Sequence, residues 1–151
     1  MACELVSCEL AHVELMGALH ARCFAEYWDA PSLARLMAGP GTFAFVATNA
    51  DDNDPLGLII CRVAADECEI LTIGVIEDAR RVGIGRRLLD AAQARARDDG
   101  ARRMFLEVGA ANTAALNLYQ ARGYGQVGRR RNYYRTTERE AEDALVLRLD
   151  L

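Results

Sequence analysis

Two patterns in the 151-residue chain contain residue types that could do chemistry: a glycine turn and a carboxylate within an apolar strand. The turn runs from Arg80 to Gly85 and reads R-R-V-G-I-G. It follows an apolar run rich in β-branched residues and precedes leucines and alanines at helical spacing. A strand that becomes a helix through two glycines leaves free backbone N–H groups at the positive end of the helix dipole. Such a turn binds anions, most plausibly phosphate.

The carboxylate is Glu107, in the segment R-M-F-L-E-V. If this segment is a strand, Met104 and Leu106 face one way, whereas Phe105 and Glu107 face the other. A carboxylate in the middle of an apolar strand costs free energy unless it is solvated or used. Glu107 is therefore a candidate for acid–base chemistry, and a solvated strand residue is the structural alternative.

Three phosphate ligands can be compared at the glycine turn. A nucleotide P-loop needs a lysine after its last glycine, and the chain contains no lysine. A dinucleotide fingerprint needs a third glycine three residues after Gly85, where Leu88 stands. The pattern that remains is Gln/Arg-x-x-Gly-x-Gly/Ala, filled by Arg80, Gly83 and Gly85. A plain surface turn is the alternative to a ligand site.

The elements that must position these residues follow from hydrophobic periodicity. A single domain over 1–151 is expected, with a mixed α/β sheet in one layer flanked by helices. The expected strands are Cys3–Cys8, Thr42–Thr48, Leu56–Val63, Ile70–Ile76, Arg103–Val108, Tyr124–Arg129 and Asp143–Leu149. The expected helices are Glu9–Trp28, Pro31–Met37, one from Ile84 to Gly100 and one from Asn112 to Gly123, and a long polar connection joins the last two strands.

Composition excludes several classes of function. A formal charge of −4 argues against general nucleic-acid affinity. The sequence shows neither an apolar run near the ~20 residues of a membrane span nor a signal-peptide pattern, which predicts a cytoplasmic protein. Five cysteines without a CxxC pair and two histidines eight residues apart predict buried thiols and no metal site.

Several spaced motifs in the right order resemble the GNAT acetyltransferase superfamily, within it the ribosomal-protein-alanine N-acetyltransferase branch, and the resemblance covers essentially the whole chain. They are E-I-L-T-I-G-V, R-R-V-G-I-G-R-R-L-L, L-E-V-x-x-x-N-x-x-A-L-N-L-Y-x-x-x-G-Y, R-x-N-Y-Y and E-D-A-L-V-L. The resemblance implies a mostly antiparallel sheet of about seven strands with a splayed central pair, flanked by about four helices. Arg135 stands where a proline frequently follows the tyrosine pair of this family.

The resemblance also implies roles. Glu107 would act as general base and Tyr119 as general acid in direct acetyl transfer from acetyl-CoA, and a tyrosine used only for packing is the structural alternative. The acceptor would be a protein N-terminal amine, for which the N-terminal alanine of a small-subunit ribosomal protein is expected. Tyr133 and Tyr134 would lie near that acceptor. The residues expected to contact acetyl-CoA are Ile73, Gly74, Val75, Arg80, Arg81, Val82, Gly83, Ile84, Gly85, Arg86, Asn112 and Tyr119.

Two alternatives to this function stay open. One is an acetyltransferase for a small-molecule amine or another protein, and the other is a non-catalytic acyl-CoA-binding module. The arginine-rich segment around Tyr133 and Tyr134 could contact RNA by charge and stacking. The acidic net charge favours a loop over the acceptor cleft instead. A monomer or weak homodimer without nucleic-acid or membrane partners is expected.

Overall fold

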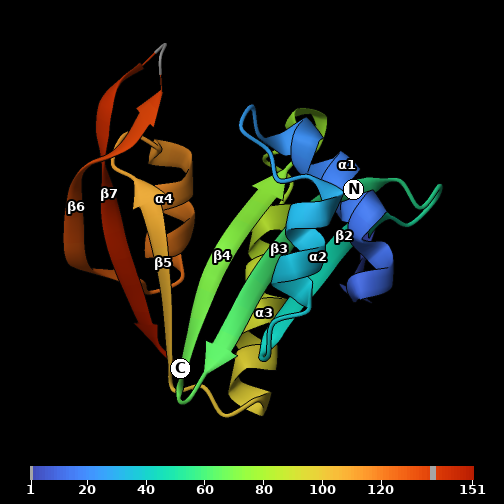
Figure 1. The fold of residues 1–151 in the computed structure, drawn as a ribbon, viewed down its shortest axis with the longest axis horizontal. Coiled ribbons are helices and arrows are strands. Elements are labelled where there is room, and N and C mark those ends of the chain that lie inside the picture. The colour runs from blue at the N-terminus through green and yellow to red at the C-terminus, as the bar shows by residue number, and fades with distance from the viewer. Residues whose placement is uncertain (1, 137–138) are drawn as a thin grey trace.

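The structure, a computed structural model, describes the backbone of residues 2–136 and 139–151, and their side chains except for those of 134–136 and 139–141. The strands form one seven-stranded sheet in the order β1-β2-β3-β4-β5-β7-β6 (Figure 1). Every neighbouring pair runs antiparallel except β4 and β5, which run parallel. The strands are β1 Cys3–Cys8, β2 Thr42–Asn49, β3 Pro55–Ala64, β4 Glu67–Val75, β5 Arg103–Gly109, β6 Gly125–Thr136 and β7 Arg139–Asp150.

The helices are held by caps that the sequence supplies. The side chain of Asp29 accepts a hydrogen bond from the Ser32 N–H at 2.9 Å and so begins α2, with proline in the first turn. Asn112 does the same for α4, where its Oδ1 accepts from the Ala115 N–H at 3.2 Å. The helices are α1 Val13–Cys23, α2 Ala30–Met37, α3 Ile84–Asp98 and α4 Thr113–Ala121, and a short 3-10 turn, Leu10–His12, precedes α1.

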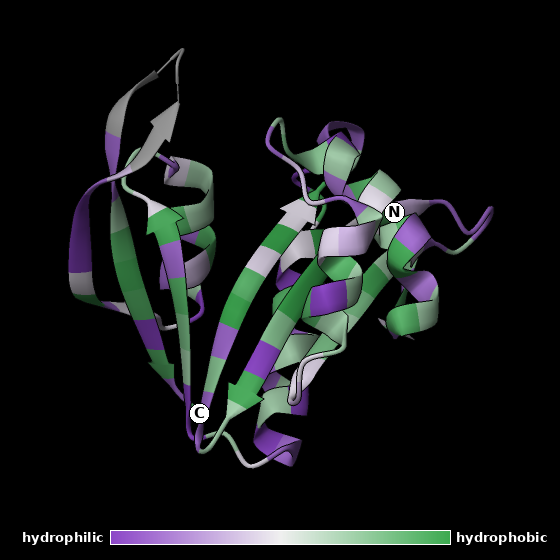
Figure 2. Ribbon diagram, in the orientation of Figure 1, coloured by the Kyte–Doolittle hydropathy of each residue, from purple (hydrophilic) through white to green (hydrophobic). Residues whose placement is uncertain are grey.

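Helices cover both faces of the sheet around β3. This strand is buried without interruption from Leu56 to Cys61, as a strand covered on both faces must be. A Cβ added to Gly57 would approach Leu88 of α3, whereas one added to Gly74 would meet Phe24, just after α1. Gly57 and Gly74 point to opposite faces, because Gly57 pairs with Val75. The apolar core therefore lies on both sides of β3, whose ribbon is mostly green, that is hydrophobic, in Figure 2.

The sheet is split at the junction of β4 and β5. These strands pair at only three positions, which join Glu67 to Arg103, Cys68 to Met104 and Glu69 to Phe105. Beyond these pairs the two strands diverge, and the gap widens toward the carboxyl ends of both (Figure 1). A bulge in β4 contributes to the divergence, because Ile60 pairs with Thr72 and Cys61 with Ile70, which leaves Leu71 as an extra residue.

Most predicted elements are confirmed, and the predictions for the last connection and for the first helix are wrong. The polar connection expected between the last two strands is itself strand, since β6 continues to Thr136 and β7 begins at Arg139. The hairpin lies at an edge of the sheet, where charged residues are tolerated because both faces can remain solvated. The helix expected over Glu9–Trp28 ends at Cys23, because Phe24 adopts an extended conformation.

The cysteines behave as the sequence predicts. All five are free thiols, and four of them, Cys3, Cys8, Cys61 and Cys68, are buried. Burial raises the pKa of the Cys61 thiol well above its usual value, which suits an unreactive core residue. Within the described part of the chain, none of the helices is long and apolar enough to cross a membrane.

Candidate functional site

The glycine turn begins α3 with a backbone that only a residue tolerant of positive φ adopts easily. Gly83 is the N-cap of α3 with φ 86° and ψ 11°, and Arg81 before it also has a positive φ of 68°. A Cβ on Gly83 would have no neighbouring atom within 4 Å, so the space outside the turn is open. The first N–H groups of α3 have no partner within the helix, and the open space beside Gly83 could hold a ligand near them.

The charges around this turn favour an anion. The first turn of α3 has no acidic residue, and instead contains the exposed Arg86 and Arg87. Cations at a helix N-terminus oppose the helix dipole, so this placement disfavours the free helix and favours a bound negative group. Arg87 also donates to the Cys3 carbonyl oxygen at 2.5 Å, which ties α3 to β1. Arg80 Nε donates to the Val75 carbonyl oxygen at 3.0 Å and fixes the turn to the end of β4.

The predicted donor-binding segment of β4, residues 73–75, lies on the split side of the sheet. Its partners on β3 run from Ile59 to Gly57, whereas its pairing with β5 has already ended at Glu69. Backbone groups on the β5 side of this segment are therefore not used in the ladder with β5. Packing alone explains why residue 74 is glycine, since an added Cβ would lie 2.7 Å from the Phe24 ring.

Glu107 lies on β5 across the split from this segment. The burial of β5 alternates as predicted, with Met104 and Leu106 buried and Glu107 partly exposed, its side chain at 22%. Its Oε1 forms an ion pair with Nε of Arg130 on β6 at 2.9 Å. The Arg130 guanidinium lies over the ring of Tyr133, 5.2 Å from its centre. The side chain of Tyr134, the other predicted acceptor residue, is outside the described side chains.

Tyr119 is buried in α4, at 4% exposure, with its ring edge-on to Tyr124 at 5.7 Å. Tyr124 in turn donates to Gln93 Oε1 of α3 at 3.1 Å, and burial raises the pKa of this phenol. The residue before Tyr119, Leu118, would be 3.5 Å from a Cβ on Gly85. Helix α4 therefore packs beside the glycine turn.

The side chain of Asn112, which was predicted to contact acetyl-CoA, already forms a hydrogen bond within the protein. Its Oδ1 caps α4, which leaves its amide N–H groups and the second lone pair of Oδ1 for a ligand. The turn before it is held by Glu142 of β7, which accepts from the Ala111 N–H at 2.7 Å. The structure thus brings together the glycine turn, the open edge of β4 and α4, and it separately joins Glu107 to Arg130 and Tyr133.

His20 is a residue of this region that the sequence did not single out. It is buried on α1, its Nδ1 accepts from the Trp28 N–H at 2.9 Å, and its Nε2 lies 3.1 Å from Thr72 Oγ1 on β4. Its ring stacks on Trp28 and contacts Phe24. Because Nδ1 accepts, the proton of the neutral ring is on Nε2, which donates to Thr72.

Burial lowers the pKa of His20 to about 4, so the side chain is neutral at pH 7. Through its two hydrogen bonds, His20 connects the segment after α1 to Thr72 of β4, just beyond the last residue of β4 that pairs with β5. A signal for it existed in the sequence, because His20 follows Met16 at the i+4 spacing of the apolar face of α1.

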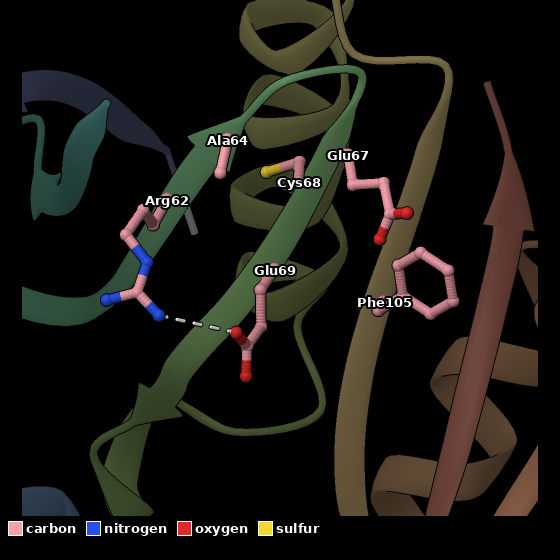
Figure 3. A pocket seen from close by; sticks show the side chains of 6 residues that line it. All are labelled: Arg62, Ala64, Glu67, Cys68, Glu69 and Phe105. Atoms are coloured by element: carbon pink, nitrogen blue, oxygen red, sulfur yellow. Dashed lines mark ion pairs between the residues drawn. The ribbon is translucent and has the colours of Figure 1, made fainter. Parts of the chain in front are cut away.

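A separate hollow of about 240 Å³ lies on the sheet where β4 and β5 still pair (Figure 3). It contains the exposed ion pair between Arg62 and Glu69, whose atoms are 3.6 Å apart. Phe105 is the residue of β5 that lines it. None of the predicted site residues lines this hollow, so it is distinct from the region of the glycine turn.

The model of the acetyltransferase (GNAT) family matches residues 13–124, which include β4, the glycine turn, β5 and α4. With the split sheet and the glycine turn at the start of α3, this match shows that the chain belongs to the acetyltransferase (GNAT) family.

Particular members resemble it more specifically. The ribosomal protein bS18-alanine N-acetyltransferase of Escherichia coli is 38% identical over 92 residues, which cover 61% of this chain and 62% of that protein. The match thus spans slightly less than two thirds of that relative. The crystal structure of the ribosomal-protein-S18-alanine N-acetyltransferase from Escherichia coli has a TM-score of 0.89 at 30% identity, over 99% of this chain and 94% of that chain. NAA60 of Arabidopsis thaliana, solved with acetyl-CoA, shares the fold, with a TM-score of 0.82 at 16% identity over 99% of each chain.

Proposed function

We propose that this protein transfers the acetyl group of acetyl-CoA to the N-terminal amine of a protein, and that its acceptor is the N-terminal alanine of a small-subunit ribosomal protein. The observation that carries the proposal is the combination of an open glycine turn, an edge of β4 that is not paired with β5, and a carboxylate on the facing strand β5. The name of the Escherichia coli relative supports the choice of acceptor.

The residues of the site fit acetyl-CoA. The N–H groups at the start of α3, with Arg81, Val82 and Arg86 around them, suit the pyrophosphate, because they supply donors and positive charge. The edge of β4 at residues 73–75 suits the amide groups of the pantetheine arm, which can pair with backbone groups as a strand would. Acetyl-CoA supplies an acetyl group activated as a thioester. The described residues form no cluster of His, Cys, Asp and Glu suited to a metal ion.

Glu107 takes the proton of the acceptor. An α-amino group has a pKa of about 8, against about 10.4 for a lysine side chain, so a carboxylate acting through water is a sufficient base. As the amine nitrogen bonds to the acetyl carbon, its proton passes to Glu107 and the carbon–sulfur bond breaks. Tyr119 gives its proton to the departing thiolate and then regains one from solvent. Each of the two proton transfers contributes about 10²- to 10⁴-fold in rate.

Acetylation of matched peptides tests this function. The protein is incubated with acetyl-CoA and an alanine-initiated peptide of a small-subunit ribosomal protein, and mass spectrometry locates the acetyl group. Acetylation at the N-terminus, and none on the same peptide with a blocked N-terminus and a free lysine, supports the proposal. An unmodified peptide together with acetylated small amines would instead identify a small-molecule acetyltransferase. Binding of acetyl-CoA without turnover of any amine would identify a non-catalytic module.

A ribosomal acceptor would place the reaction in the cytoplasm, and a monomer or weak homodimer of the 1–151 domain would suffice for it. The oligomeric state is measured by light scattering at the concentrations used in the assay. A stable larger assembly would overturn this part of the proposal.

A further inference from the structure

Glu107, the proposed base, is held by one specific arginine. Its Oε1 is 2.9 Å from Nε of Arg130, and its side chain is 22% exposed, against 57% for Arg130. A pair that is partly shielded from water is stronger and better oriented than one on the open surface. The contact joins residues 23 positions apart, on two strands that are not neighbours in the sheet.

The register of the sheet explains how Arg130 reaches this carboxylate. Glu107 of β5 and Gly128 of β6 both pair with Val146 of the intervening strand β7. Arg130 is two residues beyond Gly128 on the same face, because the pairing with β7 is regular between these positions. Gly128 has no side chain beyond its Cα, so the surface over Val146 stays open for the arginine to cross.

The neighbouring arginine has a different partner. Arg129 Nε pairs with Asp143 of β7 at 2.6 Å, and the same carboxylate accepts from the Asn132 N–H at 2.8 Å. Arg129 therefore stabilises the hairpin itself. Arg130 instead extends to β5, with its guanidinium over the ring of Tyr133, which is half exposed.

We propose that Arg130 is a positioning residue for Glu107, which holds the carboxylate from the β6 side of β5, opposite the split between β4 and β5, and links it to the β6–β7 hairpin. This inference rests on the proposed function, since it assigns Arg130 an effect through Glu107. Arg130 does not contact the reacting atoms. It restricts the rotamers of Glu107, so that the carboxylate is already placed when the acceptor amine arrives.

Steady-state kinetics of the full chain separate this role from general stabilisation. We expect Arg130→Gln to lower kcat about tenfold, which corresponds to a typical interaction energy between contacting residues. The KM for acetyl-CoA should not change, because Arg130 does not contact the glycine turn. Arg130→Lys keeps a cation and should recover part of the loss. Arg103→Gln is the matched control, since Arg103 is also on β5 but forms its ion pair with Asp66, at 3.2 Å, and not with Glu107. It should keep kcat at the wild-type value.

A double-mutant cycle provides the sharpest readout. Glu107→Gln alone should lower kcat by about 10²- to 10⁴-fold. Adding Arg130→Gln to Glu107→Gln should then cause no further loss, because no carboxylate remains to be oriented. Multiplicative losses in the double variant, or a wild-type kcat for Arg130→Gln, would overturn the inference and leave the proposed function standing. A wild-type kcat for Glu107→Gln would overturn both the inference and the role of Glu107 in the proposed function.

Discussion

Acidification should destabilise the protein at the segment between α1 and α2, because it protonates one buried histidine, His20. The Nδ1 atom of this buried ring already accepts the Trp28 N–H, so a proton can enter only by breaking that bond and by placing a charge between two aromatic rings. Burial accordingly lowers its pKa to about 4 in the folded protein, against about 6.5 in an unfolded chain. Above pH 6.5 both states hold a neutral ring, and His20 contributes no pH dependence.

Between pH 6.5 and pH 4 the unfolded chain binds a proton at this position and the folded protein does not. The free energy of unfolding therefore falls as the pH falls through this window. From pH 7 to pH 5 the pKa difference corresponds to a loss of about 2 kcal/mol, and the loss reaches about 3 kcal/mol near pH 4. These values are upper limits if water reaches the ring when it becomes charged.

Urea unfolding followed by the fluorescence of Trp28, the single tryptophan, measures this effect at pH 7 and pH 5. In His20→Asn an amide replaces the ring and does not titrate. We expect this variant to be less stable at pH 7 and to lose about 2 kcal/mol less than the wild type on acidification. His12→Asn, which replaces an exposed histidine, is the control and should behave like the wild type. An equal loss in His20→Asn and the wild type would refute the reasoning.

Three further outcomes follow from the glycines and from Tyr119. Gly83→Asp should weaken acetyl-CoA binding in calorimetry by at least tenfold through charge repulsion at the anion turn, whereas Gly100→Asp, at a similar φ of 93° and in open space, should leave affinity unchanged. Equal affinities in the two variants would contradict the placement of the donor. Gly74→Ala should lower the free energy of unfolding by about 1 to 3 kcal/mol, because its Cβ would meet the Phe24 ring, while Gly125→Ala should be nearly neutral in the same thermal melts. Tyr119→Phe should lower kcat by about 10²-fold or more, and full activity would exclude Tyr119 as general acid.

The predictable part of the fold came from local patterns. The strand–glycine–helix succession at Arg80 to Gly85 and the alternation around Glu107 are visible over a few residues, so the glycine turn and the burial of β5 were foreseen. The β6–β7 hairpin was only partly foreseen, because an edge hairpin rich in arginine lacks the apolar alternation by which strands are recognised.

Contacts between distant segments could not be predicted in the same way. His20 meets Thr72 across 52 residues, and Glu107 meets Arg130 only because β7 sets the register of both neighbouring strands. A one-residue change in that register would turn Arg130 to the other face of the sheet. The composition of a segment does not determine this register, so the partner of Glu107 became known only from the structure.

The brief pairing of β4 with β5 has a consequence for how the molecule opens. Three residue pairs join the block of β1 to β4 to the block of β5 to β7, and each block has longer internal ladders. The junction is reinforced by contacts that include the ion pairs Arg122–Asp90 at 3.0 Å and Arg103–Asp66 at 3.2 Å and the Tyr124–Gln93 hydrogen bond at 3.1 Å. Backbone amides along this seam should exchange with deuterium sooner than those of β2 and β3, since local opening follows the fewest bonds. A ligand that lies along the seam and binds only when the two blocks are joined would slow the exchange on both sides. Ligand binding and the opening of the seam would then be thermodynamically coupled.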